Sequence, residues 1–268
     1  MGNYYQGKKV WLTGASSGIG EAMAKSLARQ GAELVISGRR KEKLQELASE
    51  LRTLAENREP HVLAFDLGSN ADREEAIEVV KQLWWAPDLL ILNGGLSQRS
   101  LVMETNLEVY SNLMEVDYLA NVHLSKAFLE EWVTKGEGQV AVTSSLVGKF
   151  GTPYRSGYAA AKHALHGFFD TLRAERAGDG LKVTILCPGF IHTQVSVNAL
   201  TGDGSALGEM DQAQAKGMSA PRFAEKALKA IAKNKAEVYI GGKEVLGVYL
   251  KRLLPSVFRK MIGRAKVR

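Results

Sequence analysis

Short apolar runs rich in Val, Ile and Leu alternate with longer stretches of helical period along most of the chain. The apolar runs predict seven strands, at Lys9–Thr13, Glu33–Ser37, His61–Phe65, Leu89–Leu92, Gln139–Thr143, Lys182–Leu186 and Glu237–Ile240. Helices are predicted between them, among them Glu21–Arg29, Lys41–Ala55, Ala71–Leu83, Met114–Thr134 and Ser156–Ala177. Strand followed by helix, repeated about six times, predicts an α/β fold with a single Rossmann-type, doubly wound parallel sheet and helices on both faces.

The sequence contains no internal repeat, low-complexity tract or interdomain linker. Residues 1–242 are therefore predicted to form one domain, followed by a basic amphipathic extension at 243–268. The least regular stretch, 194–220, is rich in Gly, Ser and Ala and predicts a mobile loop over a site. At 268 residues and 45% hydrophobic content, the chain is long enough to bury a full core.

The charge of the chain is concentrated in the extension. Residues 243–268 hold eight Lys or Arg and one Glu, so the rest of the chain carries −1 of the total of +6. Without a basic face on the body of the protein, we expect no nucleic-acid partner. The extension reads as a helix broken near Pro255, and two alternatives stay open: contact with an anionic membrane surface, or packing on the core or a partner subunit.

The single cysteine, Cys187, excludes an internal disulfide, suits a reducing compartment and ends an apolar run, so we expect it in the core. The opening MGNYYQGKKV lacks the apolar centre of a secretory signal, and no uncharged apolar run reaches the roughly 18 residues of a membrane span. We expect a cytoplasmic protein that is associated with a membrane surface if the extension binds one.

The first predicted strand leads directly into the sequence TGASSGIG and then into a helix. At the carboxyl edge of a parallel sheet, Gly14, Gly18 and Gly20 allow the backbone to approach a pyrophosphate, and the helix N-terminus favours its charge. The turn therefore predicts a dinucleotide site, with Ser16, Ser17 and Ile19 as further contacts.

The end of the second strand indicates which dinucleotide is bound. A carboxylate there would accept a hydrogen bond from a free ribose 2′-hydroxyl, but the chain has Gly38 followed by Arg39 and Arg40. Two guanidinium groups suit a 2′-phosphate, so we expect NADP rather than NAD. The alternative is that these arginines only begin a solvated helix.

Further motifs follow in order along the chain: NGG at 93–95, Ser145 thirteen residues before Tyr158, the Tyr158-x-x-x-Lys162 pair, and PGFIHT at 188–193. With TGASSGIG, they make residues 8–195 resemble the short-chain dehydrogenase/reductase family in its single-domain form. The fragments NGGLSQRSL and SGYAAAKHALHGFF resemble the member seven group of that family.

The resemblance implies an NADP(H)-dependent oxidoreductase that interconverts a carbonyl and a secondary alcohol by hydride transfer. Tyr158 matches the general acid/base, Lys162 the residue that contacts the cofactor ribose, and Ser145 the residue that hydrogen-bonds the substrate oxygen. A free phenol has a pKa of about 10, and a cation one helical turn away favours the phenolate. The implied cofactor contacts after the third, fourth and sixth strands are Asp66, Leu67, Asn93, Gly94, Pro188, Gly189 and Thr193.

One position departs from the family pattern. The family has Asn 28 residues before the serine, where it helps to hold a water for proton relay, but this chain has Asp117. A carboxylate accepts hydrogen bonds from a lysine and a water, and donates one only when protonated. Asp117 is thus expected either to stabilise the Lys162 ammonium or to slow turnover, with Asn121, one turn on, as a partial substitute.

The substrate is expected to be a lipophilic carbonyl or alcohol, because the 193–220 loop and the extension show apolar residues without a charged anchor. Arg99 lies near the expected substrate mouth, in contact with either substrate or loop. His163 and His166 have no third ligand at metal spacing, so no metal is predicted. By analogy with the family, a homodimer or homotetramer is expected through the helices of Asp117 and Tyr158. The rival hypothesis is a non-catalytic NADP(H)-binding redox sensor or regulatory protein.

Overall fold

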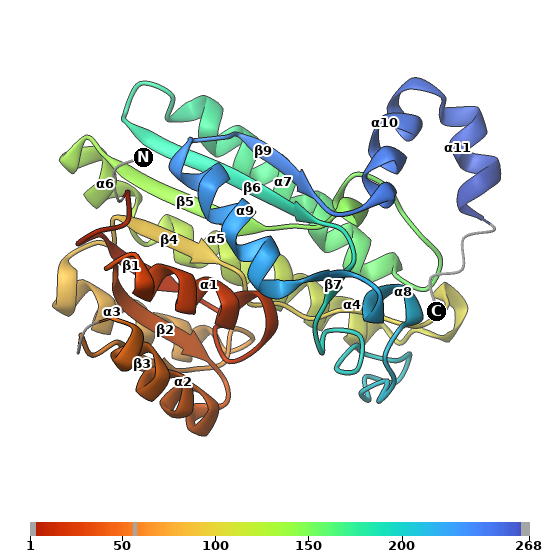
Figure 1. The fold of residues 1–268 in the computed structure, drawn as a ribbon. Coiled ribbons are helices and arrows are strands. Elements are labelled where there is room, and N and C mark those ends of the chain that lie inside the picture. Colours follow the sequence, from red (N-terminus) through yellow and green to blue (C-terminus); the bar gives the residue numbers. More distant parts are fainter. Residues whose placement is uncertain (1–3, 56–57, 264–268) are drawn as a thin grey trace.

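Seven parallel strands form one sheet in the order β3-β2-β1-β4-β5-β6-β9 (Figure 1). The structure, a computed structural model, describes residues 4–55 and 58–263. The seven predicted strands are all present, with ends displaced by at most two residues. Their bounds are β1 Lys9–Leu12, β2 Glu33–Gly38, β3 His61–Ala64, β4 Leu89–Leu92, β5 Gly138–Thr143, β6 Leu181–Pro188 and β9 Glu237–Ile240.

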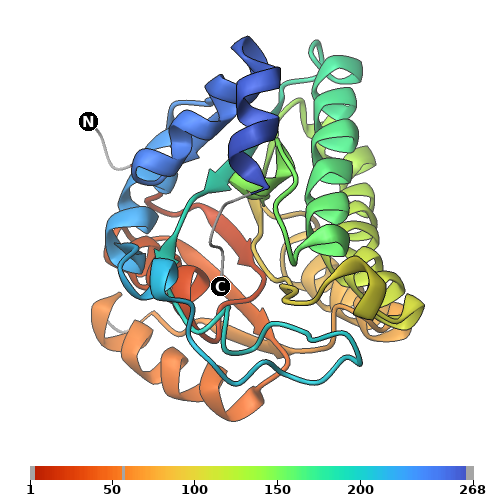
Figure 2. The same cartoon turned by 90° about the vertical axis from the view of Figure 1, so that its right-hand side faces the viewer.

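Helices cover both faces of the sheet, which confirms the predicted fold class (Figures 1 and 2). One face carries α1 Gly18–Arg29, α2 Lys41–Leu54 and α9 Ala220–Ala232, and the other carries α3 Asn70–Trp84, α5 Ala120–Lys126, α6 Leu129–Lys135 and α7 Ser156–Glu175. Successive strand residues point to opposite faces, so Leu12 packs with the first group and Trp11 with the second. Both faces are buried, which explains why the strands read as continuous apolar runs.

The predicted helix Met114–Thr134 is wrong in its extent. The helix starts earlier, as α4 Leu107–Met114, passes through a π-helical segment at Glu115–Leu119, and continues as α5. It ends where Phe128 leaves helical geometry and turns its fully buried ring against Trp11, at 5.9 Å between ring centroids. A separate helix, α6, then begins, because burying Phe128 takes the chain off the helical path.

Two segments after β6 lie near the carboxyl edge of the sheet. The 194–220 loop holds the short helix α8 Gln212–Ala215 and the short strand β8 Met218–Ser219, which pairs with β7 Ile191–His192 just before the loop. It lies over the site described below, and its mobility stays a prediction. The extension forms a hairpin of α10 Leu246–Leu253 and α11 Pro255–Ile262, which confirms the break at Pro255 (Figure 1). Within the described ranges, no helix has the length and apolar character needed to cross a bilayer.

Candidate active site

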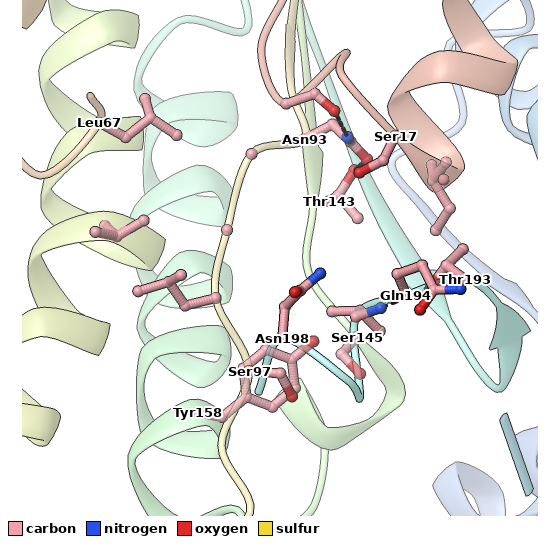
Figure 3. A pocket seen from close by; sticks show the side chains of 18 of the residues that line it. Ser17, Leu67, Asn93, Ser97, Thr143, Ser145, Tyr158, Thr193, Gln194 and Asn198 are labelled. Atoms are coloured by element: carbon pink, nitrogen blue, oxygen red, sulfur yellow. Dashed lines mark hydrogen bonds between the residues drawn. The ribbon is translucent and has the colours of Figure 1, made fainter. Parts of the chain in front are cut away.

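A cavity of about 850 Å³ lies along the carboxyl edge of the sheet, where the loops after β1 to β6 meet (Figure 3). In a doubly wound sheet this edge is where ligands bind. Two of the predicted site residues, Gly20 and Asp117, lie outside its lining. The predicted residues that line it are Gly14, Ser16, Ser17, Gly18, Ile19, Arg39, Arg40, Asp66, Leu67, Asn93, Gly94, Ser145, Tyr158, Lys162, Pro188, Gly189 and Thr193.

The glycine-rich turn after β1 is packed too closely for side chains. A Cβ on Gly14, whose φ is +66°, would lie 2.5 Å from the Cα of Gly94. A Cβ on Gly20 would lie 2.1 Å from the carbonyl oxygen of Gly14. Gly20 therefore lets α1 pack against the turn and does not itself face the cavity. The spacing of the glycines identified the turn, but it did not show that Gly14 lines the cavity whereas Gly20 allows helix packing.

The side chain of Asn93 joins the turn after β1 to the end of β5. Its Oδ1 accepts a hydrogen bond from Thr143 Oγ1 at 3.3 Å, and its Nδ2 donates to the carbonyl oxygen of Gly14 at 3.4 Å (Figure 3). Thr13 Oγ1 accepts from the backbone N–H groups of Asn93 and Gly94, both at 3.1 Å. These contacts hold the edges of three neighbouring strands in register beneath the cavity.

The two arginines after β2 both line the cavity and are both exposed. Arg40 donates through Nη2 to Ser16 Oγ at 3.1 Å and Ser17 Oγ at 3.0 Å, so it lies across the glycine-rich turn. It is also the residue before the first turn of α2. This placement is compatible both with a 2′-phosphate site and with the start of a solvated helix. The two arginines precede α2 and also present cations to the cavity.

Helix α7 and the end of β5 bring Tyr158, Lys162 and Ser145 to the same cavity. The Nζ of Lys162 lies 5.5 Å from the centroid of the Tyr158 ring and donates to the carbonyl oxygen of Thr143 at 3.2 Å. Ser145 begins a 3-10 turn at Leu146–Gly148, and its Oγ accepts from the N–H of Val147 at 3.3 Å. Figure 3 shows Ser145 and Tyr158 with Ser97 and Asn198, which also line the cavity and which sequence reasoning missed.

Gln98, another residue missed from the sequence, positions Tyr158. It is fully buried, and its Oε1 accepts from the N–H groups of Gly157 at 2.8 Å and Tyr158 at 3.3 Å. The first N–H groups of a helix have no partner within the helix, so this amide satisfies them and fixes the start of α7. The only sequence signal was its place in the loop after β4, where site residues gather.

Asp117 lies behind Lys162. It is fully buried in the π-helical segment, and its Oδ1 accepts from the N–H of Leu96 at 2.7 Å. Its Oδ2 lies 3.8 Å from Lys162 Nζ and has no hydrogen-bond partner among the described residues. Burial raises the pKa of Asp117, although the charge of Lys162 and the N–H of Leu96 act in the opposite direction. Asn121 donates to the backbone oxygen of Asp117 at 2.8 Å and, like Asp117, does not line the cavity. Its role as a partial substitute stays a prediction.

Arg99 contacts the loop. Its Nε donates to Asp211 Oδ2 at 2.9 Å, and Arg155 reaches the same oxygen at 3.4 Å. All three side chains are buried. The contacts of the two arginines with Asp211 hold the 194–220 loop over the cavity, which both arginines line. Burial and the charge of Arg99 lower the pKa of Arg155 to about 10. Of the two roles expected for Arg99, the structure shows the loop contact.

The histidines of α7 have separate surroundings. His163 contacts the carbonyl oxygen of Ala159, whereas the potential ligand atoms of His166, Asp170 and Glu237 lie within 4.8 Å of one another. Glu237, far away in sequence, thus supplies the neighbour that sequence spacing could not reveal. Lys149 Nζ already contacts this group, at 3.1 Å from Glu237 and 3.4 Å from His166 Nδ1.

A doubly wound sheet with this glycine-rich turn and this Tyr–Lys helix defines an oxidoreductase of the dinucleotide-binding class. Residues 8–203 match the family model described as short chain dehydrogenase, and the chain belongs to that family. It is 39% identical over 259 residues to the dehydrogenase/reductase SDR family protein 7-like of Anopheles gambiae, covering 95% of this chain and 82% of the relative. It is 38% identical over 267 residues to dehydrogenase/reductase SDR family member 7B of Mus musculus, and the alignment covers 98% of this chain and 83% of the relative. The resemblance to the member seven group is thereby confirmed.

Among solved structures, an alcohol dehydrogenase from the archaeon Thermococcus sibiricus, complexed with 5-hydroxy-NADP, superposes with a TM-score of 0.74 at 27% identity. That comparison covers 89% of this chain and 97% of the other. The L-sorbose reductase of Gluconobacter frateurii gives a TM-score of 0.80 at 23% identity, and the comparison covers 91% of this chain and 99% of the other. These likenesses agree with the fold described above.

Proposed function

We propose that the protein is an NADP(H)-dependent oxidoreductase that interconverts a carbonyl and a secondary alcohol. The observation that carries this proposal is the joint lining of one cavity by the glycine-rich turn, Arg39 and Arg40 on one side and by Ser145, Tyr158 and Lys162 on the other. An extended dinucleotide fits a cavity of about 850 Å³ whose floor is kept free of side chains at Gly14.

The residues present suit each part of NADP. Arg39 and Arg40 would supply cations for a 2′-phosphate, and the N-terminus of α1 would supply backbone N–H groups for the pyrophosphate. Asp66 and Leu67, which also line the cavity, would contact the adenine. Pro188, Gly189 and Thr193 also line the cavity and would contact the nicotinamide. The NADP analogue in the Thermococcus structure supports the same cofactor class here.

The bound nicotinamide supplies or accepts the hydride. In the reducing direction, the Tyr158 hydroxyl donates a proton to the carbonyl oxygen as negative charge develops there. The Ser145 hydroxyl donates a hydrogen bond to the same oxygen. Lys162, oriented by the carbonyl oxygen of Thr143, holds a positive charge beside the phenol and favours its phenolate after the proton has left.

Tyr158→Phe tests this mechanism. We expect NADPH binding, followed by nicotinamide fluorescence, to be retained, and reduction of a panel of carbonyls to fall about 100-fold or more. Full activity in the variant would overturn the role of Tyr158. NADPH binding by the natural protein without turnover of any carbonyl would instead favour the non-catalytic redox-sensor hypothesis.

A further inference from the structure

Arg73, on α3, is a buried cation with no part in the mechanism proposed above. It is 3% exposed, its Nη1 donates to the carbonyl oxygen of Leu67, and its Nη2 donates to Asn70 Oδ1 at 3.1 Å. The preceding residue, Asp72, accepts from the N–H of Asp66 through Oδ2 at 3.2 Å. The first turn of α3 therefore holds both residues of the turn after β3.

The same guanidinium also contacts the neighbouring long helix. Its Nη1 lies 2.7 Å from Glu115 Oε1, and its Nε donates to His123 Nδ1 at 3.2 Å. Glu115 begins the π-helical segment, and His123 belongs to α5. Arg73 thus joins the turn after β3 to the segment that carries Val116 and Asp117.

The two segments that Arg73 joins also form part of the cavity, because Leu67 and Val116 both line it. A Cβ on Gly94 would lie 2.5 Å from Leu67 Cδ1, and a Cβ on Gly68 would lie 3.5 Å from Val116 Cγ2. Figure 3 shows Leu67 well away from Ser145. We call the part of the cavity lined by Leu67, Val116 and Gly94 the adenine end, after the cofactor contact proposed above.

A buried arginine supplies something here that apolar packing does not. Replacing a buried ion pair by apolar side chains of similar volume is often neutral or stabilising, so stability alone does not call for Arg73. The planar guanidinium presents five N–H donors in a fixed fork, which holds its acceptors at set distances from one another. These acceptors come from the turn after β3, α3, the π-helical segment and α5.

We propose that Arg73 is a positioning residue for the adenine end of the cavity. It fixes the turn after β3 relative to the π-helical segment, and so sets the separation of Leu67 and Val116 that an adenine ring requires. This inference rests on the proposed function, because the cofactor itself is proposed. It adds that the affinity for the adenosine part of the cofactor depends on a residue outside the cavity.

Two fragments of the cofactor test the two ends of the cavity separately, without any reaction. Adenosine 2′,5′-bisphosphate carries the adenine and the 2′-phosphate but no nicotinamide, and its Kd is measured by calorimetry. Reduced nicotinamide mononucleotide lacks the adenosine, and its Kd is measured by nicotinamide fluorescence. A residue that only stabilises the fold has no reason to weaken the first fragment and spare the second.

Arg73→Lys keeps the charge but cannot hold all four acceptors at once. We expect the turn after β3 to take its binding arrangement roughly a tenth of the time in this variant, which raises the Kd for adenosine 2′,5′-bisphosphate about tenfold. The Kd for reduced nicotinamide mononucleotide should stay within about twofold of its original value. Glu115→Gln leaves Arg73 in place and removes only the ion pair, so it should raise the first Kd about threefold even if Arg73→Lys does not fold.

Arg173→Lys is the matched control. Arg173, on α7, also donates to two backbone carbonyl oxygens, those of Val183 at 3.2 Å and Ala236 at 2.9 Å, and it does not line the cavity. We expect both fragments to bind Arg173→Lys as they bind the natural protein.

The outcomes separate this inference from the proposed reaction. No binding of adenosine 2′,5′-bisphosphate to the natural protein, equal weakening of both fragments in Arg73→Lys, or an equal effect of Arg173→Lys would overturn the positioning role. So would unchanged binding of adenosine 2′,5′-bisphosphate in both Arg73→Lys and Glu115→Gln. If the fragments behave as expected but no carbonyl is reduced, Arg73 stands as a positioning residue and the proposed reaction fails alone.

Discussion

Asp117 is a buried carboxyl whose Oδ2 lies 3.8 Å from Lys162 Nζ. Because burial raises the pKa of Asp117, it takes up a proton at higher pH than an exposed aspartate does. Protonation removes the negative charge that supports the Lys162 ammonium. We therefore expect the kcat of the natural enzyme to fall about tenfold per pH unit below that raised pKa, and Asp117→Asn to lack this acid limb.

The measurement is kcat for NADPH-dependent reduction across the acid range in both enzymes. Asp179→Asn is the control, because Asp179 is a half-buried carboxylate that pairs with Arg176 at 3.1 Å and does not line the cavity. Identical profiles for the natural enzyme and Asp117→Asn would show that the carboxyl has no electrostatic role. A uniformly slower Asp117→Asn enzyme with an unchanged profile would assign it to packing.

Arg40 provides a second test at the residue scale, because it touches only Ser16 and Ser17 among the contacts described above. A charge-assisted hydrogen bond contributes about 1.5–3 kcal/mol, so Arg40→Ser should raise the Kd for NADPH about 10- to 100-fold. NADH, which lacks the 2′-phosphate, is the internal control and should bind within about twofold of its original affinity. Equal weakening of both cofactors would mean that Arg40 only supports the glycine-rich turn.

At the scale of elements, Glu237 fastens the edge strand β9 to its neighbours. Burial alone would raise the pKa of Glu237, but hydrogen bonds with His166, Tyr239 and Lys149 outweigh it and lower the pKa to about 2. A carboxyl with a lowered pKa in the folded state stabilises the fold above its unfolded pKa of about 4.3, and loses that contribution as the pH falls toward 2.

Glu237→Gln should therefore lower the free energy of unfolding by about 2 kcal/mol at neutral pH, and the difference should shrink as the pH falls below about 4. Denaturant titrations over this pH range measure it. Glu225→Gln, at an exposed position on α9, is expected to change stability by less than about 0.5 kcal/mol at any pH. A penalty for Glu237→Gln that is equal at all pH values would contradict the electrostatic explanation.

The elements that the sequence predicted well are those set by local pattern. Strands buried on both faces appear as apolar runs, and the turn after β1 appears as glycines because no other residue fits at Gly14. The break between α5 and α6 was not predictable in this way, because Phe128 leaves helical geometry where its ring packs against Trp11 and Trp132. The helical period of apolar residues in the sequence does not reveal such tertiary packing.

The same limit applied to parts of the site. Gln98 and Asn198 come from loops far apart in sequence, and nothing in their local pattern indicates that one holds α7 and the other lines the cavity. Asp117 was predicted from its position relative to Ser145, but its place behind Lys162 and outside the cavity follows from the π-helical segment. The roles of residues that act through long-range contacts could therefore be identified only from the folded structure.

At the scale of the whole molecule, charge and exposed apolar surface coincide on the hairpin. α10 and α11 pack on the core through Val248 and Phe258, so core packing accounts for part of the extension. Val257 and Met261 stay 53% and 49% exposed, and the exposed cations of the hairpin are Lys251, Arg252, Arg259 and Lys260. This combination favours peripheral binding to an anionic bilayer, with apolar side chains at the headgroup boundary.

Sedimentation with phosphatidylserine-containing vesicles tests this binding. Each basic side chain near an anionic surface contributes about 1 kcal/mol, so Arg252→Gln/Arg259→Gln/Lys260→Gln should weaken binding on the order of 100-fold. Lys226→Gln/Lys229→Gln/Lys233→Gln removes the same charge from exposed positions on and just after α9 and should leave binding nearly unchanged. Equal losses in both variants would indicate attraction by net charge alone.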